Sequence, residues 1–490
     1  MKKVMVTILS LLSFASSLLF AQTAPDTTWT KTYSGGDYEW GRCVKQTSDG
    51  GYIIVGDTKS FGAGNFDVWL IKTGVNGDTM WTKTFGGISE DRGYSVQQTT
   101  DEGYIIAGTT SSYGTGGYDI WLIKTDSSGN SEWTKTFGGN GWEWGYSVQQ
   151  TTDGGYVIVG FADPTGMGIF NVRLIKTDSI GNNPWIKTFG GSSSDGGKFV
   201  RQTSDGGYII VGDTYSFGAG SRDVYLIKTN SSGDTSWTKT FGGSDSDGGY
   251  SVRQTSDNGY IVVGYTESFG AGDEDVWLIR TDAGGDTLWT KTFGGTNKDG
   301  GESVQQTVDG GFIVAGYSRS YGAGNYDFWL IKTDSSGNTL WTKTIGGSDQ
   351  DWGRSVQQTT DGGYIVVGDS YSFTAGWYNI RLIKLDQETG IFFQTTLKPD
   401  KFNLANYPNP FNSSTIIEFE TFEQGRATVG VYNLRGQKVK NVVSRKLPAG
   451  KHSFSWNGTD NNGRIVSTGI YFYRVMLNNK IITKKMTLVR

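Results

Sequence analysis

The sequence predicts an all-β protein: a seven-bladed β-propeller followed by a small Ig-like β-sandwich. A motif close to "WTKTFGG" recurs every 52 residues, and each unit contains four short segments rich in β-branched and aromatic residues. No part of the unit shows helical periodicity. Four strands per unit, repeated seven times at this spacing, are typical of a propeller of four-stranded blades. The motif begins at Trp29, Trp81, Trp133, Trp185, Trp237, Trp289 and Trp341.

Glycine-rich turns predict how the four segments pair. "TSDGG" and "TDSSGN" are so short that they join only antiparallel neighbours, which places the Trp motif on the outer edge of each sheet. The first copy, at Trp29, is then left without a sheet of its own. We expect it to close the ring as the outer strand of the last blade. The rival for this place is the segment 391–396, which lacks the Trp and Lys of the motif.

The start of the chain has the pattern of a secretory signal peptide. Lys2 and Lys3 precede an apolar run, and Ala21 is a small residue at the expected cut, which could lie a few residues either way. No later apolar run reaches the roughly 20 residues of a membrane helix. We therefore expect a secreted or surface-held chain without a transmembrane segment. The expected parts are a signal peptide at 1–21, the propeller at 22–396, a linker at 397–406 and the C-terminal domain at 407–490.

Charge and composition exclude several functions. The chain has one cysteine, Cys43, and one histidine, His452, which lies outside the repeats. The repeats therefore contain neither a His-based zinc site nor a Ser/His or Cys/His nucleophile pair, and no intrachain disulfide forms. From Lys401 to Arg490 there are 14 Lys and Arg against 4 Asp and Glu, while the whole chain carries −4. The remainder is thus acidic, and nucleic acid is not an expected partner.

A carboxylate follows each motif tryptophan by ten residues. We expect these seven side chains to ring the central channel near one face, where they could hold a cation or a basic partner. The alternative is that each acid accepts backbone N–H bonds in its own loop. The metal is left open, and no other cofactor is predicted. The seven are Glu39, Asp91, Glu143, Asp195, Asp247, Asp299 and Asp351.

An aromatic residue recurs in the "SFGAG" loop, which emerges on the same face as these acids. Aromatic rings beside acidic groups suit sugars or protein loops, although such rings also serve as hydrophobic plugs between blades. The third unit departs from the pattern, with Pro164 and Met167 in this loop and Arg173 in place of a strand tryptophan. The aromatic candidates are Phe61, Tyr113, Phe217, Phe269, Tyr321 and Phe373.

Two further residue types recur in every unit. The lysine of "WTKT", first seen as Lys31, lies on a predicted outer edge strand, where it would hinder association between sheets of different molecules. The aspartate of "DGG" is predicted to form an Asx turn on the opposite face. The turn aspartates are Asp49, Asp101, Asp153, Asp205, Asp257, Asp309 and Asp361.

The C-terminal residues resemble a known family of domains. "YPNPF" from Tyr407, "DNNGR" after Trp456, "GIYFYRV" from Gly469 and the terminal "KKMTLVR" are together similar to the C-terminal sorting domain of type IX secretion substrates. The resemblance covers about residues 405–490. It implies passage through the outer membrane by the type IX machinery, then release or attachment at the cell surface. The repeats resemble bacterial "GG…D…G…DGGY" propeller repeats, which names a fold and no activity.

These observations favour a non-enzymatic propeller that binds an extracellular polysaccharide or protein partner. The near-identical units argue for this, because an active site normally needs one locally distinct constellation. One alternative is a carbohydrate-active enzyme that uses propeller carboxylates as acid and base. The other is a purely structural surface protein.

Overall fold

The computed structural model describes residues 23–163, 166–182, 184–373, 376–388, 405–421, 425–433, 437–448, 450–477 and 480–489. The chain divides into two compact units, residues 1–390 and 391–490. In the described ranges every regular element is a β-strand. The expected signal peptide and residues 391–404 lie outside these ranges.

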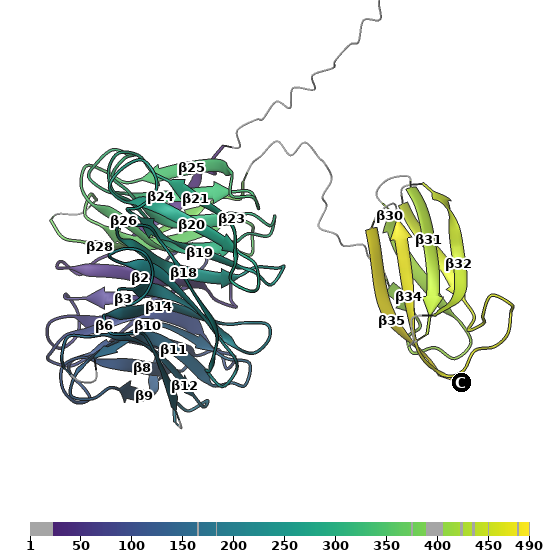
Figure 1. Ribbon diagram of the computed structural model, residues 1–490, viewed down its shortest axis with the longest axis horizontal. Coiled ribbons are helices and arrows are strands. Elements are labelled where there is room, and N and C mark those ends of the chain that lie inside the picture. Colours follow the sequence, from purple (N-terminus) through teal and green to yellow (C-terminus); the bar gives the residue numbers. More distant parts are fainter. Residues whose placement is uncertain are drawn as a thin grey trace, which may run out of the picture. The chain divides into compact units, whose positions relative to one another are not determined.

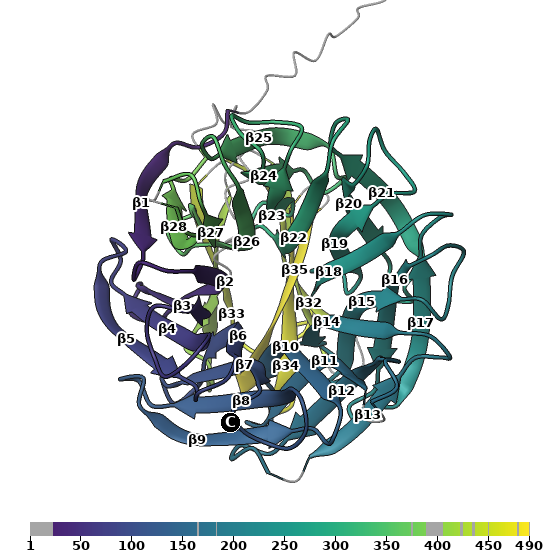
Figure 2. The same ribbon diagram turned by 90° about the vertical axis from the view of Figure 1, so that its left-hand side faces the viewer.

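The first unit is a ring of seven antiparallel four-stranded sheets, and the prediction of a seven-bladed propeller is confirmed. Figure 2 shows the sheets arranged around a central opening, with the inner strands nearest to it, and Figure 1 shows the ring from the side. The inner strands are β2 (Glu39–Gln46), β6 (Asp91–Gln98), β10 (Trp142–Gln150), β14 (Asp195–Gln202), β18 (Asp247–Gln254), β22 (Asp299–Gln306) and β26 (Asp351–Gln358). We number the blades 1 to 7 in this order.

Three further strands complete each blade. The second strands are β3 (Tyr52–Thr58), β7 (Tyr104–Thr110), β11 (Tyr156–Asp163), β15 (Tyr208–Thr214), β19 (Tyr260–Thr266), β23 (Phe312–Ser318) and β27 (Tyr364–Ser370). The third strands are β4 (Asp67–Thr73), β8 (Asp119–Thr125), β12 (Asn171–Thr177), β16 (Asp223–Thr229), β20 (Asp275–Thr281), β24 (Asp327–Thr333) and β28 (Asn379–Leu385). The outer strands of blades 1 to 6 are β5 (Thr79–Phe85), β9 (Ser131–Phe137), β13 (Trp185–Phe189), β17 (Thr235–Phe241), β21 (Thr287–Phe293) and β25 (Thr339–Ile345).

The outer strand of blade 7 comes from the start of the repeats. β1 (Thr27–Tyr33) pairs antiparallel with β28, and Trp29 lies opposite Lys384. The prediction that the first motif copy closes the ring is therefore confirmed. The rival segment, 391–396, lies outside the described residues.

The propeller core lies between neighbouring blades. Seven clusters of buried apolar side chains each join the facing sheets of two adjacent blades. The "YIIV" strands are buried along their whole length because both of their faces are covered, whereas the outer strands alternate between exposed and half-buried residues. Each motif tryptophan packs edge-on against the first aromatic residue of the next blade's second strand, as Trp81 does on Tyr104 at 5.8 Å. The repeated tryptophan thus joins consecutive blades.

The outer-strand lysines also connect blades. The Nζ of Lys31 lies 2.7 Å from Asp78 in blade 1, and Lys187 and Lys239 reach Asp234 and Asp286 of the following blade in the same way. All three pairs are exposed, so each contributes at most about 1 kcal/mol. The lysine therefore has a contact within the molecule in addition to the predicted role at an exposed edge.

At the same end of the strands as these pairs, each "DGG" aspartate binds a buried cation. In blade 1, the Asp49 carboxylate accepts bonds from the Gly51 N–H at 3.0 Å and from Lys72 Nζ at 2.8 Å. The Lys72 ammonium is buried and also donates to the Thr73 carbonyl at 2.8 Å. The Asx turn predicted here is therefore combined with an ion pair across the sheet.

We expect Asp49→Asn to lower the free energy of unfolding by about 1 to 2 kcal/mol at neutral pH. The substitution leaves buried Lys72 without its carboxylate, although the half-exposed position of Asp49 reduces the effect by solvent screening. Burial acts to raise the pKa of Asp49, but hydrogen bonds from Lys72, Thr47 and Gly51 outweigh it and lower the pKa to about 2. Urea unfolding of both proteins at several pH values measures the difference.

The sign of the pH effect follows from the lowered pKa. The contribution of the pair is complete above the unfolded-state value of about 4 and is lost as the pH falls toward 2, so the two proteins should converge there. Asp286→Asn, in the exposed pair with Lys239, is the control and should change stability by less than about 0.5 kcal/mol. If the stability difference between the original chain and Asp49→Asn stays constant with pH, the ion pair is not the cause of that difference.

The second unit is a small sandwich of two sheets. One contains β29 (Ala405–Tyr407), β30 (Thr415–Thr421) and β33 (Gly450–Trp456). The other contains β31 (Gly425–Tyr432), β32 (Lys438–Leu447), β34 (Gly469–Leu477) and β35 (Lys480–Leu488).

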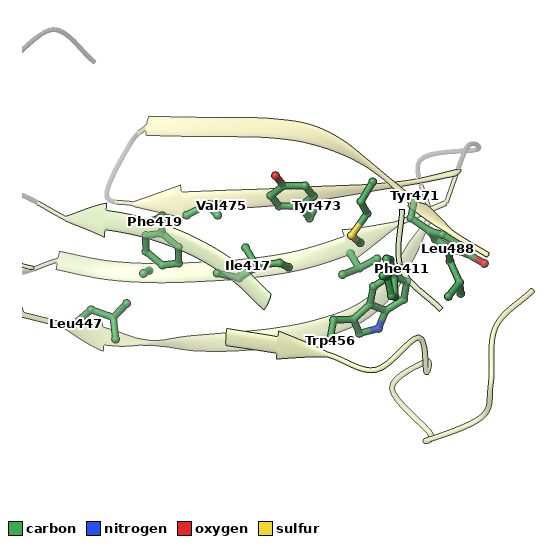
Figure 3. Close-up of a cluster of buried hydrophobic side chains, with 13 residues drawn as sticks. Phe411, Ile417, Phe419, Leu447, Trp456, Tyr471, Tyr473, Val475 and Leu488 are labelled. Atoms are coloured by element: carbon green, nitrogen blue, oxygen red, sulfur yellow. The ribbon is translucent and has the colours of Figure 1, made fainter. Parts of the chain in front are cut away.

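Residues of the quoted C-terminal motifs build the core of this sandwich. Figure 3 shows Phe411 of "YPNPF" beside Trp456, with Tyr471 and Tyr473 of "GIYFYRV" in the same cluster. The Trp456 indole is buried and donates to the Thr459 carbonyl at 2.9 Å. These motif residues therefore have a packing role in the sandwich.

Candidate functional site

The seven predicted carboxylates are buried rather than presented to the channel. Each begins or nearly begins an inner strand, and the exposed fraction of each residue is at most 1%. Five of them accept the N–H of the glycine four residues earlier at 2.8 to 2.9 Å, namely Asp91, Asp195, Asp247, Asp299 and Asp351. This is the geometry of the loop-capping alternative. Ligand binding by these carboxylates stays a prediction.

Asp195 shows the contacts in detail. Its carboxylate accepts the Gly191 N–H at 2.8 Å, the Ser216 hydroxyl at 2.6 Å and the Thr214 hydroxyl. These donors come from the link that precedes the inner strand, from the end of β15 and from the "SFGAG" loop that follows it. The carboxylate therefore fixes two loops to each other at the face where both emerge, which we call the loop face.

A second acid lies beside the first at several blade junctions. Burial, followed by the charge of the neighbouring Asp91, raises the pKa of Asp67 at the start of β4. A Cβ at Gly86, the first glycine of the motif, would lie 1.7 Å from the Asp67 carboxylate. The Gly-Gly step of "WTKTFGG" is thus required by the close approach of the link to this side chain. The same arrangement recurs at Gly242, Gly294 and Gly346.

The predicted aromatic residues are exposed on the loop face. Each ring packs on one side against a third-strand residue, for example Phe269 on Trp277 at 5.3 Å, and Phe373 on the Arg381 guanidinium at 3.5 Å. Between 43% and 47% of each residue is exposed. The rings therefore combine packing with a free surface, in Phe61, Tyr113, Phe217, Phe269, Tyr321 and Phe373.

Blade 3 differs from the others in the way that its sequence indicates. Met167 is 79% exposed in the loop where other blades carry the aromatic ring, and Arg173 on β12 is half-buried. Pro164 lies outside the described residues. The circle of loop aromatics is therefore interrupted at one blade.

The residues that line the central channel were not predicted from the sequence. Every inner strand has a β-bulge after its glycine; in β2 the ladder passes from Gly41–Gly56 to Cys43–Val55, so Arg42 has no partner on β3. These unpaired residues differ from blade to blade, although the residues around them repeat. They are Arg42, Tyr94, Tyr146, Lys198, Tyr250, Glu302 and Arg354. Their variation between otherwise similar units was the signal that could have identified them.

We call these seven unpaired residues the bulge ring. Acids largely neutralise its charges. Arg42 pairs with Asp57 at 3.2 Å, and Arg354 pairs with Glu302 at 2.7 Å and Asp369 at 3.0 Å. The Lys198 amine instead lies over an aromatic ring, 4.4 Å from the centroid of Tyr146. The wall at this level is therefore a connected polar network that differs around the ring.

Fold and site together define an all-β protein with a seven-bladed propeller and a C-terminal Ig-like domain. Residues 411–480 match the FlgD Ig-like domain family. Regulatory protein FlaEY of Caulobacter vibrioides is 24% identical over 282 residues, which is 46% of this chain and 29% of FlaEY. The chain thus spans less than a third of that relative's length. In the described residues no helix is long and apolar enough to cross a membrane.

Several solved structures have a similar arrangement of strands. Puromycin hydrolase is 13% identical with a TM-score of 0.45, over 78% of this chain and 59% of that one. PorZ, a surface component of the type-IX secretion system of Porphyromonas gingivalis, is 9% identical with a TM-score of 0.22, over 92% and 81%. The GH43 protein BlXynB of Bacillus licheniformis is 11% identical with a TM-score of 0.26, over 81% and 88%. Similarities at this level carry no inference about activity.

Proposed function

We propose that this chain is a non-enzymatic binding protein of the cell exterior, whose propeller binds a polysaccharide or a protein partner through the aromatic residues of its loop face. The observation that carries the proposal is the set of partly exposed loop aromatics at equivalent positions of six of the seven blades. Flat apolar rings that pack against a third-strand residue suit the apolar faces of sugar rings and the side chains of a protein loop.

The buried acids support this role indirectly. Because Asp195 and its equivalents join the link to the "SFGAG" loop, they hold the base of each aromatic loop in place. A site whose contact residues are fixed before binding pays less conformational entropy when the partner arrives. The carboxylates are thus positioning residues in this proposal, and the aromatic rings make the contact.

Export by the type IX route is the second part of the proposal. The resemblance of residues 405–490 to the sorting domain supports it, and so does the separation of this domain from the propeller as a compact unit of its own. In this proposal the C-terminal domain addresses the chain to the machinery, and the propeller performs the binding outside the cell.

Replacement of three loop aromatics by leucine is expected to weaken partner binding at least about tenfold, which corresponds to about 1.4 kcal/mol. The full chain is first screened against glycans and surface proteins, and the partner found is titrated against the triple variant Phe217→Leu, Phe269→Leu and Tyr321→Leu. Leucine keeps apolar packing against the third strand but removes the flat ring.

The matched control changes exposed apolar residues elsewhere. Met80→Ala and Leu288→Ala lie on outer strands, are 61% and 57% exposed, and should leave affinity unchanged. Equal affinity of the aromatic variant and the original chain would contradict the proposed loop-face site. Melting curves of all three proteins verify that the variants are folded.

A further inference from the structure

A second ring of side chains lines the channel near the "DGG" turns, at the end of the strands opposite the loop face. It is formed by the residue sixteen positions after each motif tryptophan, next to the last residue of each inner strand. These side chains surround a cavity of about 240 Å³. Four are glutamine and three are cationic: Gln97, Gln149, Gln305 and Gln357, with Lys45, Arg201 and Arg253.

The glutamines have a structural role that repeats from blade to blade. The Oε1 of each accepts the backbone N–H of the following blade's inner strand, as Gln97 does from Gln150 at 3.0 Å. Gln149, Gln305 and Gln357 make the equivalent bond at 2.7 to 3.0 Å. Because the amide oxygen is used in this way, the NH₂ group is the part that each glutamine can offer to the cavity.

The three cations cannot make this bond. Lysine and arginine side chains have no acceptor, so the inter-blade bond present at four junctions cannot form at Lys45, Arg201 and Arg253. The chain therefore gives up a repeated structural contact at three of seven equivalent positions. All three replacements introduce a positive charge into the same cavity, which indicates that the three residues act together at one site.

In the part of the chain that the structure describes, no carboxylate forms an ion pair with these three cations; Glu302, which lines an adjoining cavity with them, pairs with Arg354. The described residues that line the cavity include no carboxylate. Phe199 lies between the two arginines, with its ring centroid 4.6 Å from the Arg201 guanidinium carbon and 4.2 Å from that of Arg253. Arg253 also donates to the Val252 carbonyl at 3.0 Å. Burial, with the charges of Arg253 and Arg201, lowers the pKa of Lys45 to about 8 against an opposing effect of Cys43.

We propose that this ring is a binding site for a doubly charged tetrahedral oxyanion, a phosphate or sulfate group. The ring offers three cations and four amide NH₂ groups, so donors surround the cavity. Guanidinium groups bind oxyanions through two parallel hydrogen bonds, and a dianion compensates most of the charge of three clustered cations. In the bulge ring, farther along the channel, acids already pair with the arginines. We therefore place the anion site at the "DGG" end of the channel.

The other four blades show which residue should replace each cation in a matched variant. Lys45→Gln, Arg201→Gln and Arg253→Gln together give each blade the residue that the other four already have, and restore an acceptor for the inter-blade N–H. We expect this triple variant to melt at the same temperature as the original chain or higher when no anion is present, because three unpaired cations are removed.

Calorimetric titration of the full chain with inorganic sulfate and phosphate at low ionic strength tests the site. The original chain should bind one anion per chain, and the triple glutamine variant should bind at least about a hundredfold more weakly, as expected for the loss of three charge-assisted contacts. Lys83→Gln, Lys135→Gln and Lys291→Gln remove the same net charge from outer strands and should bind the anion as the original chain does. Equal binding by the glutamine variant, or no saturable binding by the original chain, overturns the proposal.

Two further titrations separate the sources of the anionic group. A sulfated and a phosphorylated oligosaccharide are compared with the free anions and with their uncharged parent sugars. Tighter binding of an ester than of its free anion, lost in the glutamine variant, assigns the ring to an anionic glycan. Binding of the free anions alone assigns it to a small ion. Acetate should bind more weakly than either dianion, and equal affinity for acetate would contradict the tetrahedral dianion.

Discussion

A chain that begins at residue 36, and therefore lacks β1, is expected to lose roughly 5 kcal/mol of stability. β1 makes a six-residue antiparallel ladder with β28, and each backbone bond contributes about 1 kcal/mol net. The same strand carries Trp29, which packs on Tyr52 at 5.9 Å, and buried Tyr33, whose hydroxyl donates to the Gly77 carbonyl at 2.7 Å. Denaturant unfolding of the shortened and full chains measures the loss.

Two controls make this result specific to the closing strand. A chain that begins at residue 24 keeps β1 and should unfold like the full chain. A synthetic peptide of residues 22–36, added to the shortened chain, should raise its melting temperature in a concentration-dependent manner, because it can occupy the vacated edge of β28. Unchanged stability of the shortened chain would mean that another segment, such as 391–396, can take this edge.

Combined replacement of Asp195, Asp247 and Asp299 by asparagine is expected to cost roughly 3 to 9 kcal/mol. Each carboxylate is buried. At Asp195 and Asp299 one oxygen accepts the glycine N–H and the other accepts a Thr or Ser hydroxyl, so an asparagine NH₂ would face one of these donors. At Asp247 the NH₂ would take the place of Oδ1, a buried oxygen without a hydrogen-bond partner among the described residues. An unmet buried donor costs about 1 to 3 kcal/mol. The three sites lie in different blades, so their effects should add. Melting temperature and urea midpoint are the measurements.

The same variant separates the two interpretations of the carboxylates. Asp245→Asn is the control, because Asp245 is an exposed aspartate of the same loop and should change stability by less than about 0.5 kcal/mol. A triple variant that melts normally yet no longer binds a cation or partner would instead support direct binding by the carboxylates. If each of the three substitutions, tested alone, leaves the free energy of unfolding almost unchanged, the capping explanation is wrong.

Much of the propeller could be predicted because its determinants are local and repeated. The spacing of the tryptophans gave the number of blades, and the short "DGG" turns allowed only antiparallel pairing. The surplus copy at Trp29 then had one vacant edge to occupy, next to β28. None of these steps needs the three-dimensional position of a side chain.

The site was less predictable because burial depends on how separate loops fold over one another. The position of Asp91 in the repeat could not show that Ser112 and Thr110 of the next loop would enclose it. The bulge at Arg42 was not predicted for a similar reason, since the residue pattern of a strand with an extra, unpaired residue does not differ from that of a regular strand. For the bulge residues, the variation between units contained the usable information, whereas the acids recur in every unit and give no such signal.

The bulge has a consequence for how such a protein can acquire new partners. Arg42 and its six equivalents have no ladder partner on the second strand, so their identity is free of the pairing rules that hold the neighbouring residues constant. A substitution in one unit changes one position of the channel wall and leaves the strand pairing of all seven blades unchanged. Gene duplication followed by single-residue drift can therefore produce many differently charged channels from one repeat, with no change in the scaffold that carries them.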